Sequence, residues 1–180
     1  MSRITGQVRI VGAGLLGASI GHALVMRGVD VILHDASRTN VSLAIDYGAG
    51  RAPAEGDDPS LVIVAVPPDA TADVIASELA AWPNATVTDV SSVKAGNLRE
   101  LEYLGADLSR YVGSHPLAGR ERGGAISARA DLFIGRPWVI TGGQGKHRRL
   151  VEDLVIALEA LPVTMSAEEH DASVALVSHV

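Results

Sequence analysis

The residue with the clearest chemistry in this sequence is His115, which lies in the glycine-flanked segment 113–119. Pro116 follows it, and a residue before proline is pushed out of the α region into an extended conformation. We place this histidine at the carboxyl end of a strand over residues 111–114, where open α/β sheets carry their sites. Because imidazole can act as a general base near neutral pH, the position favours catalysis by His115 over a packing role.

A second polar group, Ser91, Ser92 and Lys94, follows a strand predicted over residues 86–90 and precedes a helix predicted over residues 94–104. Either serine could be the N-cap of that helix. A lysine in the first turn opposes the helix dipole, at a cost of roughly a few tenths of a kcal/mol. Since capping does not explain this lysine, we expect Lys94 to face a crevice that binds an anionic ligand.

Three glycines, Gly12, Gly14 and Gly17, have G-x-G-x-x-G spacing directly after an apolar strand predicted over residues 7–11. The first permits a tight turn, the second lets a pyrophosphate approach the backbone, and the third lets the next helix pack against the strand. The N-terminus of that helix offers free N–H groups to the phosphates. A glycine-rich turn that binds nothing is the alternative. The predicted cofactor-binding loop comprises Gly12, Gly14, Leu15, Leu16 and Gly17.

The acidic residue Asp35 follows a second strand, predicted over residues 29–33. A carboxylate at this place can accept hydrogen bonds from both hydroxyls of an adenosine ribose, and it repels a 2′-phosphate. This favours NAD as the cofactor. Ser37 and Arg38 come next and could hold a 2′-phosphate, so NADP remains possible. The alternative role of Asp35 is to cap a helix over residues 37–47.

A third cofactor contact is expected at Val66, Pro67 and Pro68, which end the strand predicted over residues 61–66. Proline cannot donate to a β-ladder, so it stops the strand there. At the carboxyl edge of a sheet these residues would pass beside one ribose of a dinucleotide. A rigid turn without a ligand is the alternative.

Strands and helices alternate along the rest of the chain. This order is typical of an α/β, Rossmann-type fold with a mostly parallel, doubly wound sheet and flanking helices. The further predicted elements are strands over residues 137–141 and 162–165 and helices over residues 146–161 and from 167 onward.

Composition narrows the possible partners and locations. The chain has 180 residues, of which 47% are hydrophobic and 20% charged, and a net charge of −6. The acidic balance argues against nucleic acid as a partner. There is no cysteine, so we expect neither disulfides nor a cysteine-based metal site. Since the sequence shows no signal peptide and no apolar run near the roughly 18 residues of a membrane span, we expect a soluble, cytoplasmic protein without metal.

The order of the motifs resembles the prephenate/arogenate dehydrogenase family of tyrosine biosynthesis. The resemblance covers nearly the whole chain, and its most specific part joins D-x-x-S-x-K to G-S-H-P-L-A-G. It rests on Gly12-x-Gly14-Leu15-x-Gly17, Asp35, Val66-Pro67-Pro68, Asp89-x-x-Ser92-x-Lys94, the segment 113–119, His170-Asp171 and Ser178-His179.

The resemblance implies oxidation of the ring alcohol of prephenate or arogenate by hydride transfer to NAD(P)+, with loss of carbon dioxide. His115 would take the hydroxyl proton, and Ser92 would orient both the hydroxyl and His115. Ser178 would touch the substrate side chain. The family commonly has a small residue where this chain has Arg120, before Glu121, so Arg120 either contacts a substrate carboxylate or is a surface residue. Two serine-type hydrogen bonds can hold such a histidine in one tautomer.

The resemblance also implies a domain organisation. Residues 1–165 correspond to the dinucleotide-binding domain, and residues 166–180 to the first turns of an all-helical domain that forms a homodimer in the family. That domain supplies a further histidine and an arginine beyond residue 180, so the choice between prephenate and arogenate stays open. The alternatives are another β-hydroxyacid-type dehydrogenase or imine reductase with the same Rossmann half, or a non-catalytic NAD(P)-binding module.

Overall fold

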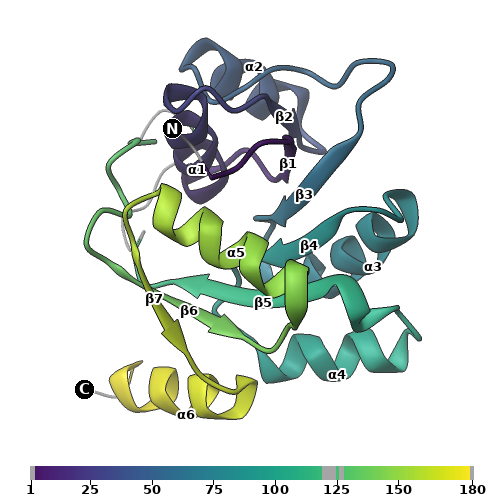
Figure 1. Cartoon of the computed structure of the whole chain (residues 1–180), viewed down its shortest axis with the longest axis vertical. Helices are drawn as coiled ribbons and strands as arrows, with labels where there is room; N and C mark the ends of the chain where they lie inside the picture. The colour runs from purple at the N-terminus through teal and green to yellow at the C-terminus, as the bar shows by residue number, and fades with distance from the viewer. Residues whose placement is uncertain (1–2, 119–124, 126–127, 179–180) are drawn as a thin grey trace.

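The computed structural model describes residues 3–118, 125 and 128–178. Seven strands form one sheet in the order β2-β1-β3-β4-β5-β6-β7 (Figure 1). All neighbouring strands pair in parallel except β5 and β6, which are antiparallel. The strands are β1 (Gln7–Val11), β2 (Val31–His34), β3 (Pro59–Val64), β4 (Thr86–Asp89), β5 (Tyr111–Pro116), β6 (Pro137–Thr141) and β7 (Leu161–Thr164).

Helices cover both faces of this sheet, and α5 lies across the near face in Figure 1. The mostly parallel, doubly wound architecture expected from the sequence is confirmed. The helices are α1 (Leu15–Met26), α2 (Arg38–Asp46), α3 (Thr71–Ala81), α4 (Ala95–Tyr103), α5 (Gly145–Ala157) and α6 (Ala167–Ser178), with short 3₁₀ turns at Pro68–Ala70 and Leu108–Arg110.

Strand β3 shows how the apolar sequence builds two cores. Leu61 and Ile63 belong to the cluster packed beneath α1 and α5, whereas Val62 and Val64 belong to the cluster beneath α3 and α4. Successive side chains of a strand point to opposite faces, so a continuous apolar run is required when both faces are covered. The same reasoning explains why this stretch was recognisable as a buried strand.

The connection between the two halves of the sheet creates the site. From β1 the chain passes through α1 to β2 on one side, and then through α2 to β3 on the other side of β1. The carboxyl ends of β1 and β3 therefore diverge at a topological switch point, which is where open α/β sheets bind ligands. No helix in the described part of the chain is long and apolar enough to cross a membrane.

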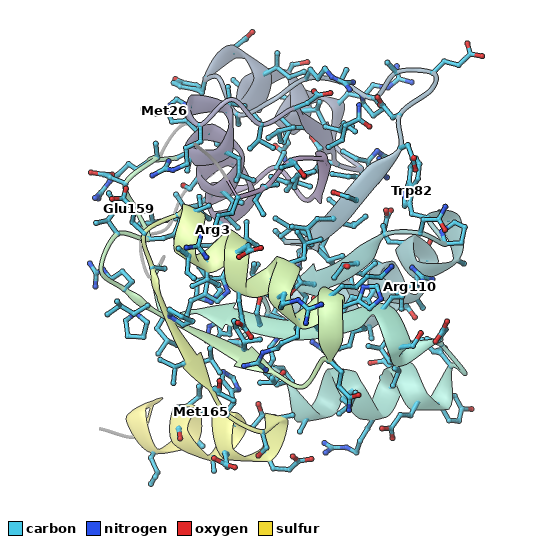
Figure 2. All side chains as sticks on the ribbon, in the orientation of Figure 1. Arg3, Met26, Trp82, Arg110, Glu159 and Met165 are labelled. Carbon is cyan, nitrogen blue, oxygen red and sulfur yellow. The ribbon has the colours of Figure 1, made fainter. Side chains whose placement is uncertain are left out.

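Arg110 fixes the far end of α3 against the sheet (Figure 2). Its guanidinium donates to the carbonyl oxygens of Leu79, Trp82 and Ala85 at 2.7–2.9 Å. These carbonyls lie at and just beyond the C-terminus of α3, where the backbone oxygens of a helix lack intrahelical partners. The contact holds the start of β5 beside β4.

Several boundaries differ from those expected, and two of these differences bear on the site. Strand β3 ends at Val64 rather than at residue 66, and β5 continues through His115 to Pro116. The extension of β5 exists because β6 pairs with it antiparallel, with His115 opposite Val139. Hydrophobic periodicity carries no information about this pairing.

Candidate functional site

The glycine loop has the backbone geometry that its spacing predicted. Gly12 has φ +109°, and a Cβ there would collide with the backbone of Ala65 after β3. A Cβ at Gly17 would overlap the carbonyl oxygen of Gly12. A Cβ at Gly14 would meet nothing within 4 Å. The outer two glycines are thus needed for close packing of the loop, while the middle one borders open space.

This open space lies at the N-terminus of α1. Gly14 is its N-cap, and neither a side-chain cap nor an acidic residue occupies the first turn. Leu15 and Leu16 pack their partly buried side chains against the core. The polar groups that these two residues present to a ligand are therefore those of the backbone. Free first-turn N–H groups and the positive end of the helix dipole suit a phosphate. The loop therefore fits the pyrophosphate of a dinucleotide.

Asp35 joins the glycine loop to the end of β2. The Ala13 N–H donates to its Oδ2 at 2.8 Å, and the Ser37 N–H donates to its Oδ1 at 2.8 Å. Each oxygen keeps a lone pair for a ligand hydroxyl. The alternative role as the cap of α2 is wrong, because Ser37 is the N-cap and its hydroxyl accepts from the Asn40 N–H.

Val66, Pro67 and Pro68 form the opposite side of the switch point. They follow β3 directly, beyond Ala65, whose N–H donates to the Val11 carbonyl at 2.7 Å. Val66 packs partly against the core, while both prolines are exposed. The predicted cofactor residues thus come from three chain segments that meet at the carboxyl edge of the sheet.

His115 lies on β5, held by the antiparallel pairing with β6. Its Nδ1 lies 2.8 Å from Nε2 of His170 on α6, and the two rings meet edge-on. Nδ1 of His170 in turn lies 2.8 Å from Oδ1 of Asp171. Burial, with added repulsion from His170 and Lys94 against the attraction of Asp171, lowers the pKa of His115 to about 4. The imidazole is therefore neutral near pH 7, and one of its ring nitrogens carries a lone pair.

Asp171 also caps helix α4. Its two carboxylate oxygens accept the N–H groups of Lys94 and Ala95 at 3.0 Å each. The expectation that Ser91 or Ser92 caps this helix is wrong: Lys94 is the N-cap residue, and the capping side chain comes from α6. A carboxylate at a helix N-terminus also interacts favourably with the helix dipole.

Lys94 borders a cavity that Tyr111 and Thr141 also line, but its ammonium is not free for the expected anionic ligand. Its side chain is 1% exposed and its ammonium pairs with the buried Asp89. Asp89 also accepts the Tyr111 hydroxyl at 2.7 Å and the Ser91 N–H at 3.1 Å. Burial lowers the pKa of Lys94 against the opposing effect of Asp89, and burial together with Asp89 raises the pKa of Tyr111. Pairing with the buried Asp89, five residues upstream, explains why a lysine stands at the start of α4, which helix capping does not explain.

The remaining predicted site residues are placed unevenly. Ser92 is exposed in the turn after β4 and makes no hydrogen bond within the described residues, and the hydrogen-bond partner of His115 is His170 instead. Ser178 is the last residue of α6, and its side chain is outside the described part, as are Arg120 and Glu121. The roles of these four residues stay predictions.

Sequence motifs alone did not assign a role to His170 or Asp171. His170 is 1% exposed and lies in the first turns of α6, next to the start of α4. Met165, labelled in Figure 2, marks the link from β7 into this helix. The only sequence signal was the adjacent His-Asp pair in the motif series, which says nothing about which residue it contacts.

The family follows from a comparison with known proteins. Residues 20–165 match the family described as prephenate dehydrogenase, nucleotide-binding domain. The chain belongs to this family. The match begins within α1, after the glycine loop, and covers the segment that holds His115 and all strands from β2 onward. The family therefore coincides with the one that the motif order resembles.

Individual relatives agree with the family match. The chain is 42% identical to a probable prephenate dehydrogenase, NovF, of Streptomyces niveus over 93% of this chain and 47% of that protein. It is 29% identical to a prephenate dehydrogenase of Bacillus subtilis over 99% of this chain and 52% of that protein. A crystal structure of the Aquifex aeolicus prephenate dehydrogenase with hydroxyphenyl propionate and NAD+ aligns with a TM-score of 0.84 at 26% identity, covering 99% of this chain and 70% of that one. The chain thus spans about half the length of the curated relatives it matches.

Proposed function

We propose that this chain is the cofactor-binding half of an NAD-dependent dehydrogenase that oxidises and decarboxylates prephenate or arogenate in tyrosine biosynthesis. The observation that carries the proposal is the arrangement of three elements at one sheet edge: an open glycine loop, the Asp35 carboxylate at the end of β2 and the neutral imidazole of His115. Family membership and the NAD+-bound Aquifex aeolicus relative support the same conclusion.

In this proposal, the bound nicotinamide supplies an acceptor for the hydride of the ring carbinol carbon. His115 accepts the hydroxyl proton as the hydride leaves, because its lowered pKa keeps the imidazole neutral at working pH. The electron pair released by loss of carbon dioxide completes an aromatic ring, which gives 4-hydroxyphenylpyruvate from prephenate or tyrosine from arogenate. The N-terminus of α1 binds the pyrophosphate, and Asp35 orients the adenosine ribose.

The choice of cofactor tests the role of Asp35. We expect calorimetry on this chain to show NAD+ binding at least about tenfold tighter than NADP+, which corresponds to about 1.4 kcal/mol. Asp35→Asn should weaken NAD+ binding and reduce that preference. Asp46→Asn, an exposed carboxyl on α2, is the matched control and should change neither affinity. Tight NADP+ binding with negligible NAD+ binding would contradict the proposal.

The role of His115 is tested by NADH formation with prephenate and with arogenate, in a protein that also carries the helical domain implied by the family resemblance, since this chain spans only about half the length of its curated relatives. His115→Asn should remove most of kcat while NAD+ affinity stays unchanged, since the base and the cofactor site are separate. His147→Asn, on α5 at the other face of the sheet, is the control for a histidine change alone. Equal turnover by the His115 variant and the unaltered chain would remove His115 from the reaction. Binding of NAD+ without any turnover in a protein that carries both domains would favour a non-catalytic module.

A homodimer and a cytoplasmic location are further parts of this proposal. Both come from the resemblance to the family and from the sequence, and both concern the whole protein rather than one site. Sedimentation of the purified protein would test the dimer, and cell fractionation would test the location.

A further inference from the structure

We propose that His170 and Asp171 are positioning residues which fix His115 in the tautomer that leaves its Nε2 free to accept the substrate proton. The inference rests on the proposed function for its purpose, but not for its geometry. It uses the hydrogen-bonded series from His115 through His170 to Asp171 and on to the start of α4. No serine is needed to hold the imidazole in this arrangement.

The hydrogen-bonded series ends at the Asp171 carboxylate, which can only accept hydrogen bonds. Asp171 accepts two backbone N–H groups at the N-terminus of α4, from Lys94 and Ala95, and both demand an acceptor. Burial alone would raise the pKa of Asp171, but hydrogen bonds from His170, Lys94 and Ala95 outweigh burial and lower it. The carboxyl group is therefore ionised and can only accept.

From that fixed end the proton positions follow in order. Nδ1 of His170 must carry its proton to donate to Asp171. If that ring carries no second proton, its Nε2 has only a lone pair. That lone pair can only accept from His115, so Nδ1 of His115 carries a proton. A neutral His115 then has an unprotonated Nε2, which is the atom able to act as base.

The surrounding charges support the same function. His170 and Asp171 face His115 from α6, and Lys94, paired with Asp89, approaches from the start of α4. When His115 takes a proton, its Nδ1–H bond to His170 strengthens and the ionised Asp171 lies at the far end of the series. In a serine–histidine–aspartate triad, the buried aspartate likewise orients an imidazole and stabilises the imidazolium. Here a second imidazole transmits that effect between the base and the carboxylate.

The test reads protonation of the ring nitrogens directly. In the complete 180-residue chain with ¹⁵N-labelled histidine, two-bond ¹H–¹⁵N spectra near pH 7 distinguish a protonated nitrogen from a bare one. We expect the Nδ1–H tautomer of His115 to exceed the Nε2–H tautomer by about tenfold or more, as a hydrogen bond of ordinary net strength would give. A His115 that is mainly Nε2–H in the unaltered chain would overturn the proposal.

Variants separate positioning from packing. His170→Leu keeps an apolar side chain in the buried place but removes the acceptor, so the tautomer ratio of His115 should fall at least about tenfold. Asp171→Ala should lower the ratio less, because His170 remains but loses its orienting partner. Glu169→Gln, an exposed neighbour on α6, is the control and should leave the ratio unchanged. A folded His170→Leu chain with the original ratio would overturn the proposal; if that variant does not fold, the unaltered chain and Asp171→Ala still decide it.

These outcomes are distinct from failure of the proposed function. The tautomer ratio is measured without cofactor or substrate, whereas the proposed function depends on NAD+ binding and turnover. A correct ratio with no NAD+ binding would leave the series intact and refute the function. NAD+ binding and turnover by a protein whose His115 is mainly the Nε2–H tautomer would support the function and refute the positioning role of His170 and Asp171.

Discussion

Replacing two of the loop glycines, Gly14 and Gly17, by alanine one at a time separates cofactor binding from folding. At Gly14 the backbone has φ −82° and ψ −158°, which alanine adopts readily, and its Cβ would meet nothing. Reduced freedom of the unfolded chain favours alanine by about 0.4–1 kcal/mol. Alanine is a poorer N-cap than glycine by a similar amount. The free energy of unfolding of Gly14→Ala should therefore stay within about 0.5 kcal/mol of the original.

The NAD+ affinity of the same variant should fall strongly. The added methyl group fills the space through which a pyrophosphate approaches the first-turn N–H groups of α1. A loss of at least about tenfold in affinity is expected, which is about 1.4 kcal/mol. Isothermal calorimetry on the 180-residue chain measures this loss, and urea unfolding followed by circular dichroism measures the stability.

Gly17→Ala is the matched contrast. Alanine inside a helix gains up to about 1 kcal/mol over glycine. Here its Cβ would overlap the carbonyl oxygen of Gly12, and such overpacking costs about 1–3 kcal/mol or more. The contact is to backbone, which cannot rotate away, so we expect a net loss of about 1–2 kcal/mol. If Gly14→Ala unfolds as easily as Gly17→Ala, or keeps its NAD+ affinity, the assignment of roles within the loop is refuted.

Two further predictions concern buried charge. Lys94→Met should lower the free energy of unfolding by about 3–5 kcal/mol, because it leaves Asp89 buried without its cation, and Lys94→Met/Asp89→Asn should recover part of this loss. Urea unfolding checks both, and unchanged stability of the single variant would show that the pair is not buried as described. The second prediction is a pH effect: the folded pKa of His115, about 4, is below its ordinary value of 6.5, so the unfolded chain binds a proton more readily between these values. Stability should therefore fall as pH falls from 6.5 to 4, by about 3 kcal/mol from this group at about 1.4 kcal/mol per pH unit. His115→Asn should have a shallower pH slope over this range, and equal slopes would contradict the burial of a neutral imidazole.

Local patterns in the sequence were enough to predict the local structure of the glycine loop and of the segment around Asp35. The conformations of Gly12 and Gly17 follow from contacts within the β1–α1 unit and with the adjoining end of β3, so spacing along the chain reports on them. The place of Asp35 follows from the length of one βαβ unit. The continuous apolar run of β3 likewise indicated a strand covered on both faces. Each of these inferences needs only the period of a strand or helix and the geometry of one turn.

The surroundings of His115 depend on contacts that no local pattern encodes. The antiparallel direction of β6 extends β5 to Pro116, yet strand direction leaves no mark on hydrophobic alternation. Lys94 was predicted to face a ligand because it opposes the dipole of its own helix. Its partner Asp89 was visible five residues upstream, at the end of a buried strand, but burial of that carboxylate is a tertiary property. The contact of His170 on α6 with His115 on β5 is likewise a tertiary property.

The double use of Asp171 has a consequence for the order in which the molecule assembles. Its contact with the Ala95 N–H closes a loop of 76 residues, whereas the Ala13–Asp35 contact closes one of 22. Closing a longer loop costs more chain entropy, so short-range units tend to form earlier. We therefore expect the glycine loop to form before α6 docks, and the base to be aligned last. The amide protons of Lys94 and Ala95 would then exchange with solvent whenever α6 detaches, even while α4 stays helical. Their exchange rates report how often α6 detaches and releases His115 from alignment. If a variant without the Asp171 carboxylate protects these two amides as well as the unaltered chain does, this view is contradicted.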